Sequence, residues 1–233
     1  MNWIQLVTAL FGPFHDVNAE GDFLRGSAVF EGQSIAVVGT TNHAPIGMAM
    51  ALAQARVILD TITHHAGRPI LLLIDTQGQQ LRRRDETLGI NRAMAHLGMC
   101  IELARARGHP VIGLVYDQAL SGGFITSGLI ADGCFALPAA EIRVMRIPAM
   151  ARVTKLSEDM LTALSQSNPV FAPGVDNFVA MGGIRAIWEH DLPAALRDAL
   201  ANTPTEDLRA RDGEQRGGRR LAAQVAKRVL AAT

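Results

Sequence analysis

The stretch "PVIGLVYDQALSGG", from Pro110 to Gly123, contains the two patterns that decide the fold. Its first half is an apolar run with the length of a buried strand. Its second half ends in two adjacent glycines, directly before an apolar segment that is predicted to be helical. Because glycine in a helix interior costs roughly 0.5–1 kcal/mol relative to alanine, this pair needs a local explanation.

Strand and helix patterns alternate on both sides of this stretch. Strands are predicted at "QSIAVVGT" (Gln33–Thr40) and "PILLLID" (Pro69–Asp75), and the second of these is apolar throughout, as expected for burial on both faces. Helices are predicted at Gly47–Ile62 and from Asp85 to about Arg107, and short strands at "CFAL" and "IRVM". This alternation predicts an α/β fold with a mainly parallel sheet covered by helices.

The last part of the chain has a different pattern. Helices are predicted at "DLPAALRDALAN" (Asp191–Asn202) and "RRLAAQVAKRVLAA" (Arg219–Ala232), joined by the polar linker Thr203–Gly218. We therefore expect a single domain over residues 1–233, with a core at about 25–190 and a helical C-terminal extension at about 191–233.

The composition excludes several classes of function. Basic and acidic residues are equal in number, so no overall field attracts nucleic acid or a membrane surface. Cys100 and Cys134 form neither a disulfide framework nor a zinc motif, and they are predicted to fill core positions. The apolar N-terminal run has no preceding basic region and is shorter than the roughly 20 residues of a membrane span. We expect a docking helix there and a cytoplasmic protein.

Two predicted strands end in irregular turns, "DTQGQQL" and "DQALSGG", and ligands of parallel α/β sheets bind at such carboxyl ends. A helix that begins near Gly122 and Gly123 directs its unpaired N–H groups and its positive dipole end to this edge. A second donor is expected from the backbone around Gln77 and Gly78. Two converging main-chain N–H groups form an oxyanion hole. The alternative is that both glycines only permit close packing between helix and strand.

The order of these pieces resembles the crotonase (enoyl-CoA hydratase/isomerase) superfamily, in its carboxyltransferase branch, over about Ser34–Trp188. Ala119–Gly123 resembles the A-L-G-G-G turn of that family, and Ile74–Gly78 resembles the D-T-P-G turn of carboxyltransferase alpha subunits. Within the branch, Trp3–Gly12 and Ser167–Ile184 are most similar to the gamma subunits of biotin-independent malonate decarboxylases.

The resemblance implies a crotonase-like (ClpP/crotonase) fold and a restricted chemistry. The two glutamates that hydratases of the family use are replaced here by Ile125 and, as the nearest candidate, Arg146. We therefore expect no positioned carboxyl group at the site, which disfavours hydration. Decarboxylation of a malonyl thioester needs only donors that stabilise the enolate oxygen.

The resemblance further implies two oxyanion holes, one from each of two related subunits. This chain is expected to hold the leaving carboxylate, and a sister crotonase-like (beta) subunit the thioester carbonyl. The expected substrate is a malonyl group on the phosphopantetheine-type arm of an acyl-carrier subunit, or on CoA, with a carrier transferase subunit in the same complex. The products are the acetyl thioester and CO2. The chain itself is expected to bind no cofactor or metal and to be inactive alone.

Three further residues are candidates for substrate binding. Ser121 is expected to contact substrate, with helix capping as the main alternative and a nucleophilic role as a minor one. Arg82, in the run Arg82–Arg84, and Arg146 suit an acyl carboxylate or an acidic carrier, although a solvated loop explains the run equally simply. His64 and His65 are predicted to form an exposed turn. Asn42 and His43 also face the carboxyl edge, without an assigned role.

Other functions remain open at the level of sequence. The chain fits a self-sufficient acyl-CoA decarboxylase or thioester hydrolase, a carboxyltransferase alpha-type subunit, or a silent scaffold that stabilises its sister subunit. Interface candidates are the N-terminal apolar segment, the aliphatic stripe of Gly47–Ile62 and the apolar face of Leu221–Leu230.

Overall fold

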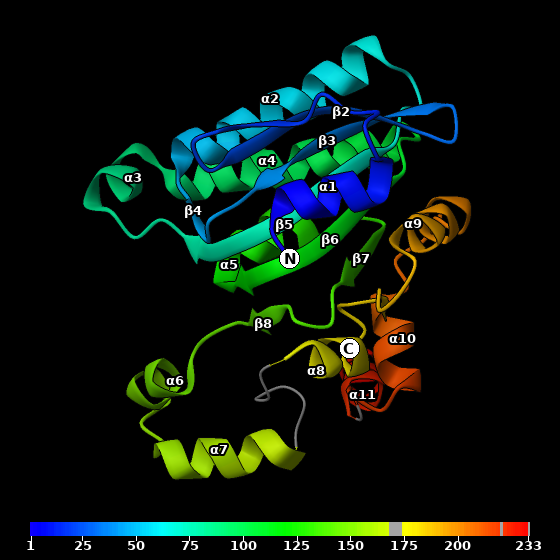
Figure 1. Cartoon of the computed structure of the whole chain (residues 1–233). Helices are drawn as coiled ribbons and strands as arrows, with labels where there is room; N and C mark the ends of the chain where they lie inside the picture. Colours follow the sequence, from blue (N-terminus) through cyan, green and yellow to red (C-terminus); the bar gives the residue numbers. More distant parts are fainter. Residues whose placement is uncertain (168–173, 220, 233) are drawn as a thin grey trace.

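In the computed structural model, which describes residues 1–167, 174–219 and 221–232, a twisted sheet forms the centre of the molecule (Figure 1). The strand order is β1-β2-β3-β5-β6-β7-β9, with β4 beside β5 and β8 beside β6. The first three strands are antiparallel and all later pairs are parallel, so the mainly parallel sheet is confirmed. The strands are β1 (Asn18–Glu20), β2 (Phe23–Phe30), β3 (Gln33–Thr40), β4 (Ala44–Ile46), β5 (Ile70–Gln79), β6 (Val111–Leu120), β7 (Gly133–Ala136), β8 (Glu141–Arg143) and β9 (Ala186–Ile187).

Helices cover both faces of the sheet. The long helices α2 and α4 pack on one face through alanine and aliphatic side chains, and α1 and α9 pack on the other. The helices are α1 (Trp3–Phe11), α2 (Met48–His64), α3 (Arg83–Leu88), α4 (Ile90–Ala106), α5 (Ser121–Phe124), the π-helix η1 (Ile125–Leu129), α6 (Ile147–Thr154), α7 (Glu158–Ser167), α8 (Val175–Ala180), α9 (Leu192–Ala201), α10 (Arg209–Gln215) and α11 (Ala222–Leu230). No helix in these described ranges is both long and apolar enough to span a bilayer.

The predicted elements are present, with two corrections at their ends. The stretch from Asp85 to Arg107 is not one helix, because Gly89 adopts a left-handed conformation with a φ of 88° and separates α3 from α4. Strands β5 and β6 each continue four residues beyond the predicted ends, at Asp75 and Tyr116. The predicted turns are therefore largely strand, because β4 and β8 pair with these extensions.

The polar stretch Thr203–Gly218 is not a linker, and this prediction was wrong. It contains α10, which is held to the body of the protein by arginine side chains. Arg209 donates to the Leu129 carbonyl (2.9 Å), and Arg216 donates to the carbonyls of Val179 (2.9 Å) and Ile184 (3.0 Å). Both arginines thus donate to main-chain carbonyl groups of the protein body. The sequence pattern alone does not distinguish such arginines from arginines that are exposed to solvent.

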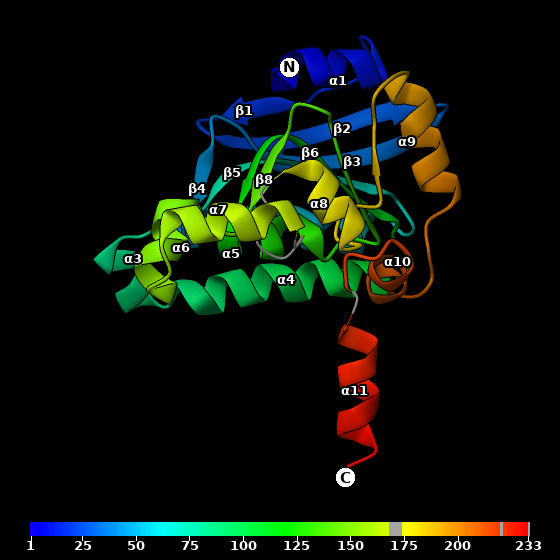
Figure 2. The ribbon, with the colours of Figure 1, turned by 90° about the horizontal axis from the view of Figure 1, so that it is seen from below.

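The N-terminal helix docks as predicted. A capping box between Asn2 and Gln5 starts α1, and its apolar face, which includes Leu6 and Val7, is buried against the sheet. Helix α11 differs, since it extends away from the body (Figure 2) and leaves Val225 and Val229 exposed. The segment Ser167–Ile184 used in the family resemblance lies partly outside the described residues.

Both cysteines fill core positions, as predicted. Cys100 lies in α4 and Cys134 in β7, and both are buried. Burial raises the pKa of both thiols, that of Cys134 to about 12. His64 and His65 lie at the exposed C-terminal end of α2, also as predicted.

Replacing Leu6 tests the docking of α1. Leu6 is 0% exposed and Ile4 on the same helix is 56% exposed. We expect Leu6→Ala to lower the free energy of unfolding by about 2–5 kcal/mol, because it leaves a cavity, and Ile4→Ala by less than about 0.5 kcal/mol. Urea unfolding followed by circular dichroism measures both. Equal effects would mean that α1 is not packed as described.

The two thiols are expected to resist alkylation in the native protein. The thiolate is the reactive form, and burial both shields the two thiols from the reagent and raises their pKa, which disfavours the thiolate. Mass spectrometry after iodoacetamide treatment at pH 8 should show no label on either cysteine, and two labels once urea is added. Labelling of the folded chain would contradict their burial.

Candidate functional site

The carboxyl ends of β5 and β6 bring the two predicted turns into direct contact. A Cβ built on Gly123 would lie 2.7 Å from the carbonyl carbon of Gly78, and one built on Gly78 would lie 2.9 Å from the Cβ of Ser121. Gly78 also has a φ of +104°, which side chains rarely adopt. Gly78 and Gly123 are therefore required for close packing. Among Gly78, Gly122 and Gly123, only Gly122 has no main-chain atom close to its missing Cβ.

The main-chain N–H groups of this turn differ in how they are satisfied. Gly122 N–H donates to Oε1 of Gln79 at 3.2 Å. Gly78 N–H donates to Oγ1 of Thr76 at 3.0 Å, and this hydroxyl donates to the Ala44 carbonyl at 2.6 Å. Of the predicted donors, the Gly122 amide is thus held by a partly buried side chain, and the Gly78 amide is fixed in the interior.

The chain enters α5 through a strained residue. Ser121 has a φ of 56°, in the left-handed region that non-glycine residues seldom occupy. Its side chain does not cap the helix, because Leu120 is the N-cap residue and no capping bond forms, so the capping alternative was wrong. The hydroxyls of Thr126 and Ser127 donate to the Gly122 carbonyl (3.1 Å) and the Gly123 carbonyl (2.7 Å), which orients this turn.

Arg82 and Arg146, the predicted anion-binding residues, stand at the starts of α3 and α6, and neither forms a hydrogen bond or ion pair with the glycine turn among the described residues. Arg82 is exposed at the start of α3 and lines a cavity of about 410 Å³, together with Gly47 and Asp85. In that cavity Asp85 accepts a hydrogen bond from the Met48 N–H at 3.0 Å and caps α2. Arg146 is exposed at the start of α6. Gln77 is exposed on β5, next to Gly78.

Sequence reasoning missed the role of one carboxylate at this edge. Asp75 is buried, and its oxygens accept hydrogen bonds from the main-chain N–H groups of His43 (3.0 Å) and Gln118 (3.3 Å). The His43 ring lies between two carboxylates, with Nε2 3.4 Å from Asp117 Oδ2 and 3.7 Å from Asp75 Oδ1. Asn42 and His43 both have positive φ values, of 58° and 52°. Asp75 therefore joins the ends of β3, β5 and β6.

Burial raises the pKa of Asp75, and the His43 N–H and ring oppose this shift. The ligand atoms of His43, Asp75 and Asp117 lie within 4.8 Å of one another, a spacing that suits a cation. Because both oxygens of Asp75 already accept main-chain hydrogen bonds, we interpret the group as a structural ion-pair network.

Strand β8 contributes a second polar pair that the sequence analysis did not identify. The register places Glu141 beside Gln118 and Arg143 beside Leu120, directly before the glycine turn. Glu141 and Arg143 form an ion pair. Asp75, Asp117 and Glu141 therefore lie at the same edge of the sheet, but Asp75 and Glu141 are already paired within the protein, and the expectation of no positioned carboxyl group at the site stays a prediction. Glu141 directly precedes the predicted strand "IRVM", whereas the resemblance places the family glutamate after that strand.

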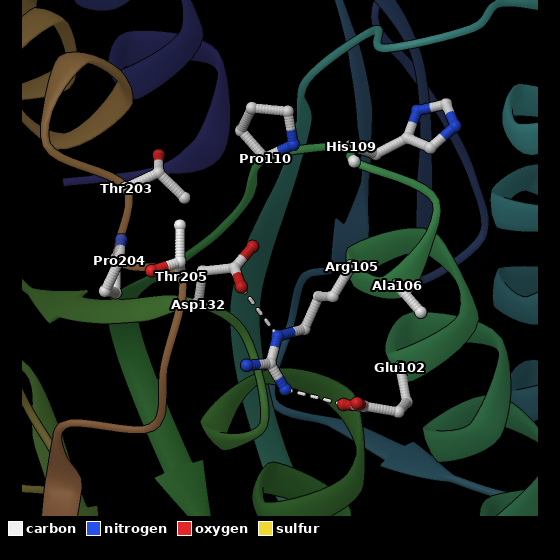
Figure 3. A pocket seen from close by; sticks show the side chains of 10 residues that line it. Glu102, Arg105, Ala106, His109, Pro110, Asp132, Thr203, Pro204 and Thr205 are labelled. Carbon is white, nitrogen blue, oxygen red and sulfur yellow. Dashed lines mark hydrogen bonds and ion pairs between the residues drawn. The ribbon is translucent and has the colours of Figure 1, made fainter.

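A different cavity, of about 370 Å³, lies at the opposite, amino-terminal ends of β6 and β7 (Figure 3). Arg105 dominates it, and its guanidinium contacts Asp132 (2.7 Å) and Glu102 (2.6 Å). Asp132 also accepts the Val111 N–H at 2.8 Å. Arg105 pairs with both carboxylates and joins α4 to the residue before β7, so each of these three charged groups already has a partner within the protein.

A mainly parallel sheet, two glycine turns at the carboxyl ends of adjacent strands and a short helix after the second turn define the crotonase-type carboxyltransferase fold. The family profile described as malonate decarboxylase gamma subunit matches residues 41–233. The chain belongs to this family.

Known relatives agree with this assignment. The chain is 34% identical over 174 residues to the protein of Malonomonas rubra named malonyl-S-ACP:biotin-protein carboxyltransferase MADD, covering 68% of this chain and 60% of that protein. A Pseudomonas malonate decarboxylase hetero-tetramer in complex with coenzyme A contains a chain of similar structure, with a TM-score of 0.81, 23% identity and 98% coverage of both chains. A chain of transcarboxylase 12S matches with a TM-score of 0.71 and 18% identity, over 86% of this chain and 41% of that one.

The two adjacent glycines are expected to respond differently to alanine. In Gly123→Ala the new Cβ meets the main chain of Gly78, so we expect a loss of about 1–3 kcal/mol in the free energy of unfolding. In Gly122→Ala the new Cβ meets only the end of the Gln79 side chain, at 3.1 Å, so we expect a change below about 1 kcal/mol. Chemical denaturation of both variants measures the difference, and equal losses would contradict the described contact.

Proposed function

We propose that this chain is one subunit of a decarboxylase that converts a malonyl thioester to the acetyl thioester and CO2. The observation that carries the proposal is the turn at Gly122 and Gly123, where the Gly122 N–H is held only by the side chain of Gln79. Membership of the malonate decarboxylase gamma subunit family supports the same chemistry. The alternatives without a role in catalysis do not explain a strained turn at a sheet edge whose Gly122 amide is held only by a side chain.

The reaction needs little from the protein beyond donors in fixed positions. The bond between the carboxylate carbon and the methylene carbon breaks, and its electron pair forms an enolate on the thioester. A proton then binds the methylene carbon. Main-chain N–H groups stabilise the charge on oxygen without reorganising, and removal of one such donor typically costs about 10²–10³ in rate. The proposed donors are the amides of Gly122 and Gly123, with a further contribution from the main chain at Gln77; the fixed amide of Gly78 is the weakest candidate.

A sister subunit completes the site in this proposal. Side chains around the glycine turn are apolar and exposed, including Ile125 (43%), Val144 (58%) and Met145 (37%), which suits a surface covered by a partner. The Pseudomonas relative of known structure is a hetero-tetramer with coenzyme A, and the Malonomonas relative acts on malonyl-S-ACP, by its name. We infer an acyl-carrier subunit or CoA as donor of the malonyl group, a carrier transferase subunit, and a cytoplasmic complex. Ser121, Arg82 and Arg146 are retained as proposed substrate contacts.

Transfer of the carboxyl group is the second candidate. This candidate is supported by the Malonomonas relative, which is 34% identical to this chain and is named as a carboxyltransferase to a biotin protein. Both reactions need the same glycine turn, and they differ in whether CO2 is released or carried away on biotin.

The test is reconstitution of this chain with its sister subunit and a malonyl-loaded carrier, followed by measurement of CO2 and acetyl thioester. We expect turnover by the complex without biotin and none by the chain alone. Gly122→Pro removes one donor and should lower turnover by about 10²–10³ while assembly survives. The matched control is Gly98→Ala in α4, whose new Cβ makes only an ordinary contact of 3.5 Å.

Three results would contradict the proposal. Full activity of an assembled Gly122→Pro complex would make this chain a scaffold. Rapid release of acetyl-CoA by the chain alone would make the partner unnecessary. Release of CO2 only after a biotin protein is added would favour carboxyl transfer.

A further inference from the structure

The Gly122 amide is occupied by a side chain of the protein itself. Gln79, the last residue of β5, directs its carboxamide oxygen to this N–H at 3.2 Å. A Cβ built on Gly122 would lie 3.1 Å from this oxygen and 3.7 Å from the carboxamide carbon. The Gln79 carboxamide therefore fills the space in front of the donor that the proposed reaction uses.

The contact is weak enough to exchange. The Nε2 group of Gln79 donates no hydrogen bond to any of the described residues, so one neutral hydrogen bond holds the carboxamide. Gln79 is only partly buried, which leaves room for another rotamer. The Gly78 amide is different, because the Thr76 hydroxyl that binds it is fully buried and also bound to Ala44. Of these two satisfied amides, only that of Gly122 has a replaceable partner.

A carboxamide oxygen resembles the oxygen of a carboxylate or thioester in hybridisation and size, but it carries no full charge. Hydrogen bonds from N–H groups to charged oxygens are roughly twice as strong as those to neutral ones. The free energy of replacing the Gln79 oxygen at the Gly122 N–H by a neutral carbonyl oxygen is therefore close to zero. Replacement by an oxygen that carries negative charge is favourable. Such a site discriminates in favour of the charged state of the substrate.

We propose that Gln79 is a positioning residue that occupies the Gly122 amide in the resting protein and is displaced by an anionic oxygen of the acyl substrate. The identity of the displacing substrate rests on the proposed function. The hydrogen bond between the Gly122 N–H and Gln79 does not depend on that function. Gln79 keeps the donor satisfied and oriented when no substrate is bound, and it competes with the substrate for that donor.

Two variants of Gln79 separate this role from a structural one. Gln79→Leu removes the competitor, and in the reconstituted complex KM should fall about two- to tenfold with kcat nearly unchanged, the range of one neutral hydrogen bond. Gln79→Glu places a charged oxygen on the same N–H, and kcat/KM should fall roughly 10- to 100-fold. The controls are Gln33→Leu and Gln33→Glu at the exposed start of β3, which should leave both constants unchanged.

Other outcomes would overturn the inference. If Gln79→Glu behaves like Gln79→Leu, the carboxamide does not compete at the donor. If Gln79→Leu loses most of its kcat in an intact complex, Gln79 assists the substrate directly and is not displaced.

Hydrogen exchange of the Gly122 amide tests the inference without measuring enzyme activity, so it applies even if the wild-type complex is inactive. In the full chain labelled with 15N-glycine, solvent exchange of the Gly122 amide should be faster in Gln79→Leu than in the wild type. Equal exchange would mean that Gln79 does not hold this amide, whatever reaction the complex performs.

Discussion

The close approach of two main chains, at Gly78 on β5 and Gly123 in α5, is the constraint on which the site depends. With 2.7 Å between the carbonyl carbon of Gly78 and the position of a Cβ on Gly123, no side chain fits between the strand end and the first turn of the helix. Phe124 is buried beneath the turn and anchors it on the sheet. The positions of the Gly122 and Gly123 amides follow from this packing, and so does the strained backbone of Ser121.

Asp75 provides a second constraint at the same edge. A buried carboxylate is unfavourable unless hydrogen bonds compensate for its lost hydration. Here the main-chain N–H groups of His43 and Gln118 supply these bonds, so one side chain connects the ends of three strands. The extensions of β5 and β6 beyond this point pair with β4 and β8 and form the platform on which the glycine turn lies.

The arrangement of donors explains how a protein can present main-chain amides without leaving them all unsatisfied. The Gly78 amide is fixed internally, and the Gly122 amide is held by a carboxamide that a substrate oxygen can replace. An oxyanion site of this kind needs no acid or base of its own to lower the barrier for loss of CO2. The exposed apolar side chains beside it are consistent with a site that a second subunit closes.

The sequence by itself determined the element order, the parallel core of the sheet, the docking of the N-terminal helix and the pair of glycine turns, because these depend on local periodicity and on residues with special backbone freedom. Only the tertiary structure decided which of these groups are paired, since the partners of Gly122 and Asp75 are more than 30 residues away in the sequence. It also decided that Glu141, Asp117 and His43 meet at the same edge, because register between strands places them there. Pairing partners set such registers, and no pattern within one segment contains that information.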